Sequence, residues 1–132
     1  MGSYRILIVD EEKMVGNLVF PVLSQKGYIC EAAKDGIEAL EKIKNDSLDA
    51  VVSDIVMPQM DGITLTKELL KLHANLPVML MTGYSHESAE SAIAAGAREF
   101  ITKPFSIQEF IICFDKMMSG HGGEEPLSAP KF

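Results

Sequence analysis

The chain has 132 residues, 47% of them hydrophobic and 23% charged. This length and composition support one domain with its own core and exclude the disordered, collagen-like and disulfide-scaffold classes. The 19 acidic and 12 basic residues give a formal net charge of −7, which repels a polyanion and excludes direct binding of nucleic acid through a basic stripe. We therefore expect any DNA-directed role to act through a partner.

Cysteine usage and hydropathy predict the compartment. Cys30 and Cys113 each lie in an apolar stretch without metal-ligand spacing, and we expect both to be reduced thiols in the core. No apolar run approaches the roughly 18 residues of a membrane span, and the N-terminus lacks the basic-then-apolar pattern of a signal peptide. These features predict a cytoplasmic protein without membrane association.

Short apolar or β-branched runs alternate with segments of helical spacing along the chain. The runs predict strands at residues 4–9, 28–33, 50–53, 78–81 and 99–101. The other segments predict helices at about 12–26, at 36–44, from an N-cap at Asp61, at 85–95 and at 107–118. The first helix is expected to be kinked by Pro21 and to bury one face, formed by Val15, Leu18, Val19, Val22 and Leu23.

Strict alternation of strand and helix predicts right-handed crossovers and an α/β fold, a doubly wound five-stranded parallel sheet with helices on both faces. The continuous apolar runs at 6–9 and 50–52 are typical of central parallel strands, which are buried on both sides. The pattern leaves open which of the two common strand orders applies, but both place the ligand beyond the carboxyl ends of the strands. We expect one domain over residues 4–119 and a flexible tail over 120–132.

Polar side chains follow four of the five predicted strands. Asp10 and Glu11 follow the first strand, Asp54 the third, Thr82 the fourth and Lys103 the fifth. Three carboxylates at one edge repel one another unless a cation holds them. Because all the ligand atoms would be oxygens, the expected ion is Mg²⁺, with Mn²⁺ as the alternative.

The central position of Asp54 predicts a nucleophile. Aspartyl phosphates form when a carboxylate attacks phosphorus, and Lys103 and Thr82 could hold the remaining phosphoryl oxygens. Phosphoryl transfer depends mainly on positioning and charge stabilisation, which these residues supply without a general base. The sequence has no Gly-rich loop ending in Gly-Lys-Ser/Thr and no Gly-x-Gly-x-x-Gly after the first strand.

Four stretches resemble the receiver domain of two-component response regulators: ILIVDEE at 6–12, DIVMPQMDG at 54–62, MTG at 81–83 and FITKPF at 100–105. The resemblance extends from about residue 5 to 118. It implies a flavodoxin-like sheet of order 2-1-3-4-5 and phosphorylation of Asp54 by a histidine kinase or a histidine phosphotransfer protein. In such a module the chain catalyses only its own phosphorylation and dephosphorylation.

The resemblance also implies roles for residues around Asp54. Mg²⁺ would bind at the acidic pair Asp10 and Glu11, at Asp54 and at the backbone carbonyl of Val56. Lys103 would bind the phosphoryl group, with a cis peptide bond to Pro104, and Thr82 and Phe100 would form the switch. The family usually has Asp-Asp or Glu-Asp as its acidic pair, so Glu11 reaches one methylene further and bears on metal affinity rather than metal identity. We have no functional account of Pro21.

Two further expectations concern the output. Receivers commonly engage dimer partners or targets through the fourth and fifth helices and the strand between them, and helical spacing leaves Ile112 and Cys113 partly exposed on the last helix. Val56 and Tyr84 lie two residues after the nucleophile and the switch threonine, respectively. Neither helps a water molecule to attack, so we expect a long-lived phosphorylated state.

Two other functions compete with that of a signalling receiver. An aspartate-nucleophile phosphatase needs a second aspartate two residues after the nucleophile, and that position is Val56. A receiver-like interaction module that works without phosphorylation would normally have lost the lysine or the nucleophile. Both are present, so only the change at Glu11 leaves this alternative open.

Overall fold

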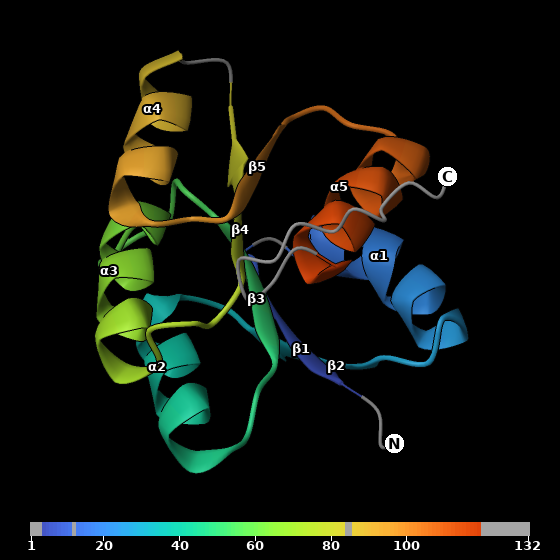
Figure 1. Ribbon diagram of the computed structural model, residues 1–132, viewed down its shortest axis with the longest axis horizontal. Coiled ribbons are helices and arrows are strands. Elements are labelled where there is room, and N and C mark those ends of the chain that lie inside the picture. Colours follow the sequence, from blue (N-terminus) through green and yellow to red (C-terminus); the bar gives the residue numbers. More distant parts are fainter. Residues whose placement is uncertain (1–3, 12, 84–85, 120–132) are drawn as a thin grey trace.

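The computed structural model describes residues 4–11, 13–83 and 86–119, and it alternates strand and helix throughout (Figure 1). Each predicted strand is present, with its ends within one residue of the prediction. The elements are β1 (Arg5–Val9), α1 (Met14–Gln25), β2 (Ile29–Ala33), α2 (Gly36–Asn45), β3 (Ala50–Asp54), α3 (Gly62–Leu72), β4 (Val78–Thr82), α4 (His86–Ala95), β5 (Glu99–Thr102) and α5 (Ile107–Ser119).

The five strands are parallel and lie in the order β2-β1-β3-β4-β5, which confirms the flavodoxin-like order. Helices α1 and α5 cover one face of the sheet, and α2, α3 and α4 cover the other (Figure 1). The chain order reverses between β1 and β3. Open α/β sheets bind ligands at such a switch point, outside the carboxyl ends of the strands.

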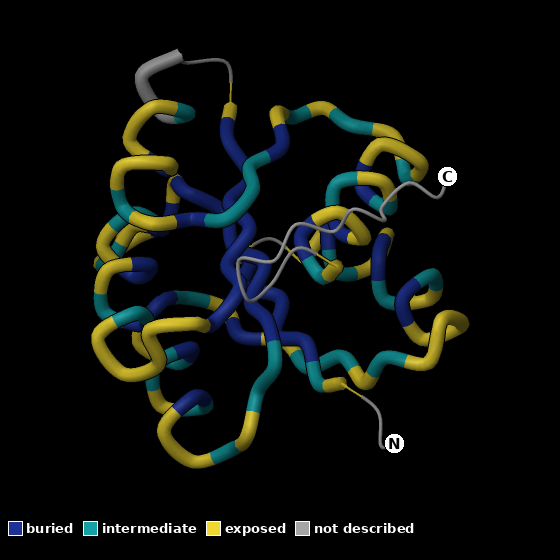
Figure 2. Tube along the Cα trace, in the orientation of Figure 1, coloured by how far each residue is buried: buried dark blue, intermediate teal, exposed yellow. Residues whose placement is uncertain are grey.

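The sheet is buried on both faces (Figure 2). Successive side chains of a strand point to opposite faces, so Leu7 and Val51 pack toward α2 and α3, while Ile8 and Val52 pack toward α1 and α5. Burial on both faces explains the continuous apolar runs in the sequence. Outside the strands, Asp61 caps α3 as predicted, since its carboxylate accepts a 2.8 Å hydrogen bond from the amide of Thr64.

Two expectations about buried side chains were wrong in part. Val15, Val19 and Leu23 of α1 are buried, but Leu18 is 45% exposed because the helix contacts the sheet along a narrower stripe than the predicted face. The helix is continuous through the exposed Pro21, and the kink expected there stays a prediction. Cys30 and Cys113 are free thiols that are only partly buried, since Cys30 lies on the edge strand β2 and Cys113 lies beside the buried face of α5.

Within the described ranges, every helix is too short or too polar to cross a membrane.

Candidate functional site

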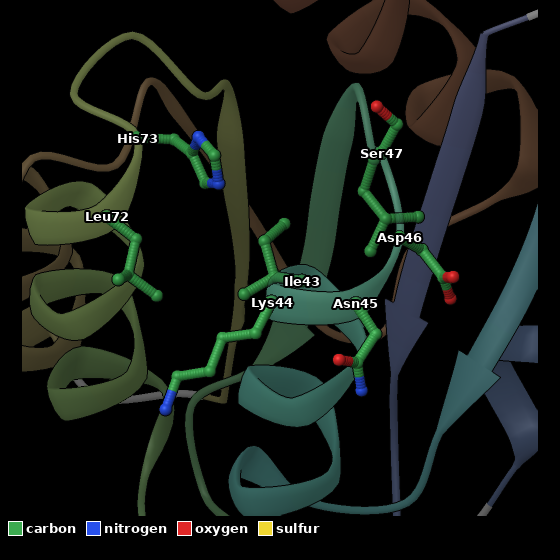
Figure 3. Close-up of a pocket in the computed structure, with 8 residues that line it drawn as sticks. Ile43, Lys44, Asn45, Asp46, Ser47, Leu72 and His73 are labelled. Carbon is green, nitrogen blue, oxygen red and sulfur yellow. The ribbon is translucent and has the colours of Figure 1, made fainter.

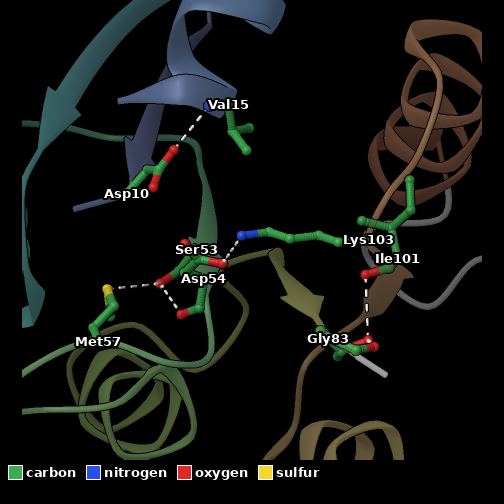
Figure 4. A network of polar contacts seen from close by, with 9 residues as sticks. Asp10, Val15, Ser53, Asp54, Met57, Gly83, Ile101 and Lys103 are labelled. Atoms are coloured by element: carbon green, nitrogen blue, oxygen red, sulfur yellow. Dashed lines mark hydrogen bonds and ion pairs between the residues drawn. The ribbon is translucent and has the colours of Figure 1, made fainter. Parts of the chain in front are cut away.

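Two carboxylates are buried side by side at the switch point. Asp10 follows β1 and is 5% exposed, and Asp54 ends β3 and is 9% exposed. One oxygen of Asp10 accepts a 2.8 Å hydrogen bond from the amide of Val15, in the first turn of α1 (Figure 4). Lys13 precedes α1 without providing a side-chain cap, so Asp10 satisfies an amide that would otherwise lack a partner within the helix.

Lys103 provides the positive charge of the site. Its ammonium nitrogen lies 2.5 Å from Oδ1 of Asp54, and the side chain reaches across from the end of β5 (Figure 4). The amide of Lys103 donates a 2.8 Å hydrogen bond to the carbonyl of Thr82, which joins the ends of β4 and β5. The peptide bond between Lys103 and Pro104 is cis, as the resemblance implied.

The electrostatics of Asp54 reflect burial more than pairing. Loss of solvation raises the pKa of Asp54, Lys103 lowers this pKa, and contact with the Asp10 carboxyl raises it again, so the net shift is upward. A raised pKa means that the charged form is disfavoured by its surroundings. The site therefore lacks positive charge, and a cation or a proton would stabilise it.

The donor set fits Mg²⁺ at two carboxylates. Asp10 and Asp54 are in hydrogen-bonding contact, and Mg²⁺ commonly takes one or two carboxylates and completes its octahedron with water and phosphate oxygens. Glu11 comes directly after Asp10 but is exposed. Among the described residues, no three His, Cys, Asp or Glu side chains are grouped as a metal site. The structure thus brings together two of the three predicted carboxylates.

The switch residues lie at the next two strands. Thr82 is fully buried at the end of β4, and its hydroxyl oxygen lies 3.5 Å from the carbonyl oxygen of Ile101 and 3.4 Å from the hydroxyl of Thr102. The hydroxyl is thus engaged with β5. Phe100 of β5 is partly buried and packs against the core on the α2 and α3 face.

Other predicted residues are placed only in part. Val56 lies in the loop after β3 and is 79% exposed. Tyr84 lies outside the described residues. The predicted partner helix α5 exposes Ile112, at 64%, and leaves Cys113 partly covered, as its spacing predicted.

One functional candidate was missed in the sequence. The hydroxyl of Ser53 is fully buried directly before Asp54 and donates a 2.8 Å hydrogen bond to the Asp54 carbonyl oxygen (Figure 4). The signal was a single hydroxyl in an otherwise apolar run of strand residues. Burying it is costly unless it is hydrogen-bonded.

A pocket at the opposite end of the sheet is unrelated to this chemistry. It lies between the C-terminal ends of α2 and α3 and is lined by Ile43, Leu48 and Leu72 together with polar side chains such as Lys44 and His73 (Figure 3). These residues lead into the amino ends of β3 and β4. The acidic site lies at the carboxyl ends.

Known proteins are similar to this chain in sequence and in fold. Residues 6–114 match the response regulator receiver domain. Response regulator MprA from Mycobacterium ulcerans is 38% identical over 110 residues, which cover 83% of this chain and 47% of that protein. The chain thus spans about half the length of the curated relatives it matches.

Solved structures agree with this match. A putative response regulator from Chloroflexus aurantiacus is 30% identical, with a TM-score of 0.83 over 88% of this chain and 98% of that one. Response regulator TrrA from Thermotoga maritima, solved in complex with Mg(2+)-BeF, is 33% identical, with a TM-score of 0.76 over 86% and 98%. By sequence and by fold, this chain belongs to the response regulator receiver domain family.

Proposed function

We propose that this chain is a phosphorelay receiver in which Asp54 accepts a phosphoryl group and the modification changes partner binding. The observation that carries the proposal is the 2.5 Å contact between Lys103 and the buried Asp54 carboxylate, beside Asp10 at the switch point of the sheet. The donor would be a phosphohistidine on a histidine kinase or a phosphotransfer protein.

In the proposed step, a carboxylate oxygen of Asp54 attacks phosphorus, forming a new O–P bond while the N–P bond of the donor histidine breaks. The electron pair of that bond stays on the imidazole, which takes up a proton from solvent. Lys103 balances negative charge that the phosphoryl oxygens bring into the buried site. When bound, Mg²⁺ would neutralise further phosphoryl charge, and it would be held by Asp10, Glu11, Asp54 and the Val56 carbonyl.

Signal output would pass through Thr82 and Phe100. The Thr82 hydroxyl would leave its contacts with β5 for a phosphoryl oxygen, and the Phe100 ring would turn inward into the vacated space. This is a shift between two packings, biased by the new contact. Addition of beryllofluoride with Mg²⁺ should change the NMR signals of the Phe100 ring, whereas unchanged signals would mean that Phe100 is a constant part of the core.

The partner surface would include α4, β5 and α5. Ile93 of α4 and Ile112 of α5 are large apolar residues left exposed beside the strand that ends at Thr102. We expect Ile112→Glu to reduce homodimer formation or target binding in the phosphorylated state. Sedimentation that shows a monomer in both states, together with normal signalling by the variant, would remove this surface from the proposal.

Incubation with acetyl phosphate and Mg²⁺ tests the proposal, with intact mass as the measurement. The wild type should gain one phosphoryl mass and Asp54→Asn should gain none. Asp61→Asn is the matched control, because Asp61 is an exposed helix cap that asparagine can replace. If the Asp54→Asn variant still gains a phosphoryl group, the acceptor is a residue other than Asp54. A wild type that gains no mass would favour the interaction module that works without phosphorylation.

A further inference from the structure

The hydroxyl of Ser53 lies between the phosphoacceptor strand and the loop that follows it. It donates a 2.8 Å hydrogen bond to the carbonyl oxygen of Asp54 and lies 3.9 Å from the sulfur of Met57, whose side chain is buried in the core (Figure 4). One buried hydroxyl thus contacts both the acceptor residue and the residue that anchors its loop. The loop between them includes Val56.

The hydrogen bond from Ser53 to the Asp54 carbonyl lies at a level where Asp54 has a neighbouring strand on one side only. The last pair between β1 and β3 joins Val9 to Ser53, so Asp54 extends beyond the end of β1. On the other side, Asp54 still pairs with Met81 of β4, and the amide of Ile55 donates to the Met81 carbonyl. The Ser53 hydroxyl therefore binds the Asp54 peptide at the level where β1 has ended.

The first residue of helix α3 packs against the same carbonyl group of Asp54. A Cβ atom at Gly62, the first residue of α3, would lie only 2.3 Å from the Asp54 carbonyl oxygen and 2.8 Å from Cα of Ile55, so only glycine fits there. The amide of Gly62 donates a 2.8 Å hydrogen bond to the Ile55 carbonyl. The loop over residues 55–61 is thus closed at its base, with the Asp54 peptide held between Ser53 and Gly62.

Packing alone does not require a hydroxyl at this position. Val51, two residues earlier on the same face of β3, is apolar and fully buried. A buried hydroxyl costs free energy that its hydrogen bond only offsets. Alanine would fill nearly the same volume without that cost, so the serine suggests a positional requirement on the Asp54 peptide.

We propose that Ser53 is a positioning residue: its hydroxyl fixes the Asp54 peptide and the base of the 55–61 loop, and thereby the carboxylate and the Val56 carbonyl that would bind Mg²⁺. This inference rests on the proposed function. Mg²⁺ demands near-ideal octahedral geometry, so a small displacement of two of its ligands lowers affinity. The same displacement misaligns the attacking oxygen.

The test compares Ser53→Ala with Thr66→Val. The Thr66 hydroxyl is also fully buried and also donates a 2.8 Å hydrogen bond to a carbonyl, that of Gly62, so each variant removes one buried side-chain hydrogen bond, beside α3 for Ser53 and within α3 for Thr66. Only Ser53 contacts Asp54. We would measure Mg²⁺ affinity by NMR titration, the phosphorylation rate with acetyl phosphate at saturating Mg²⁺, and stability by urea unfolding.

Ser53→Ala should lower Mg²⁺ affinity and the phosphorylation rate by about 3- to 10-fold each, the range expected for one lost hydrogen bond. Thr66→Val should lose comparable stability with neither effect, and Ser53→Thr, which keeps the hydroxyl, should restore both values. Equal behaviour of Ser53→Ala and Thr66→Val would overturn the proposal, and this comparison decides the matter even if Ser53→Thr does not fold. A wild type that binds Mg²⁺ but accepts no phosphoryl group would contradict the proposed function, while the Mg²⁺ titrations would still test Ser53.

Discussion

The two ends of the sheet differ in how their charged side chains are arranged. At the amino end, charges of opposite sign alternate: Arg5 pairs with Glu31, Lys42 lies 4.0 Å from the same carboxylate, and the Arg5 amide donates to Asp49. At the carboxyl end, Asp10 and Asp54 are two buried carboxylates, and the partly exposed Lys103 pairs with Asp54. The named charges at the amino end balance in sign, whereas the carboxyl end has an excess of negative charge.

The pKa directions express this difference. Hydrogen bonding to Glu31 and its charge raise the pKa of the Arg5 guanidinium, which favours the charged form of that base. Burial raises the pKa of Asp54, which disfavours the charged form of that acid. The fold thus stabilises the charged form of Arg5 at the amino end and disfavours the charged form of Asp54 at the carboxyl end. A buried carboxylate whose charge is disfavoured in this way is stabilised by a cation, which is the charge that Mg²⁺ would supply.

Loss of the lysine should have the largest effect on the carboxyl end. We expect Lys103→Met to slow phosphorylation by acetyl phosphate by about 100-fold, the usual scale for removing one charge-stabilising contact, and to raise the pKa of Asp54 further. Phosphoryl incorporation and carboxyl NMR titration measure the two effects. Lys116→Met is the control, because Lys116 is an exposed lysine of α5 whose partner is Glu99, at the start of β5 rather than at the acidic site. Equal rates for the two variants would place Lys103 outside the chemistry.

The lifetime of the phosphorylated state should change less. If Val56 and Tyr84 shield the phosphoryl group as expected from the sequence, Val56→Asn combined with Tyr84→Glu should speed decay by about 10-fold after the donor is removed, because polar side chains can orient an attacking water. The measurement is the fraction phosphorylated against time. If the double variant decays no faster than the wild type, shielding by these two positions does not govern hydrolysis.

Stability should respond in the direction opposite to function. In metal-free buffer at pH 7, Asp54→Asn should raise the free energy of unfolding by about 1 kcal/mol, the usual size of a single-site change, because it removes a buried charge next to Asp10. The folded-state pKa of Asp54 lies above its ordinary 3.8, so the wild type loses stability as the pH rises through the interval between the two values. The advantage of the variant should therefore shrink as the pH falls through that interval.

Urea unfolding as a function of pH measures this difference. Asp61→Asn, at an exposed cap, should show no such pH dependence. An Asp54→Asn variant that is less stable than the wild type at pH 7 would mean that the contact with Lys103 outweighs the cost of burial.

The amino end should give the smallest effect. Arg5→Gln removes an exposed charge from its pair with Glu31 and should lower stability slightly, and less so at high salt. Phosphorylation should stay within about twofold of the wild type, because distant sites act independently. A large loss of phosphorylation would show that the two ends of the sheet are coupled.

Much of the carboxyl end could be predicted from the sequence because it depends on strand ends. Parallel strands bring their carboxyl ends to one edge, so Asp10, Asp54, Thr82 and Lys103 follow from the positions of apolar runs. The N-cap at Asp61 follows from equally local chemistry. Such features need no knowledge of how strands are staggered.

The remaining features depend on three-dimensional detail. The partner of the Ser53 hydroxyl is set by the level at which β1 ends beside β3, and the Thr82 hydroxyl is engaged by the neighbouring strand β5. Leu18 is exposed because of how closely α1 approaches the sheet. Glu11 lies one residue beyond Asp10, and its exposure depends on the turn into α1. The stagger between strands, the distance between a helix and the sheet, and the conformation of a turn cannot be read from residue types alone.

Amide NMR spectra recorded during addition of beryllofluoride and Mg²⁺ compare the two ends of the sheet in one experiment. We expect shifts at residues 10–11, 53–57, 82–83 and 102–103, with smaller changes along β5 and α5, and none at residues 43–49 and 72–76. Asp54→Asn should abolish the shifts. Shifts centred on the amino end, or the same shifts in Asp54→Asn, would contradict the assignment of the acidic edge as the phosphoryl site.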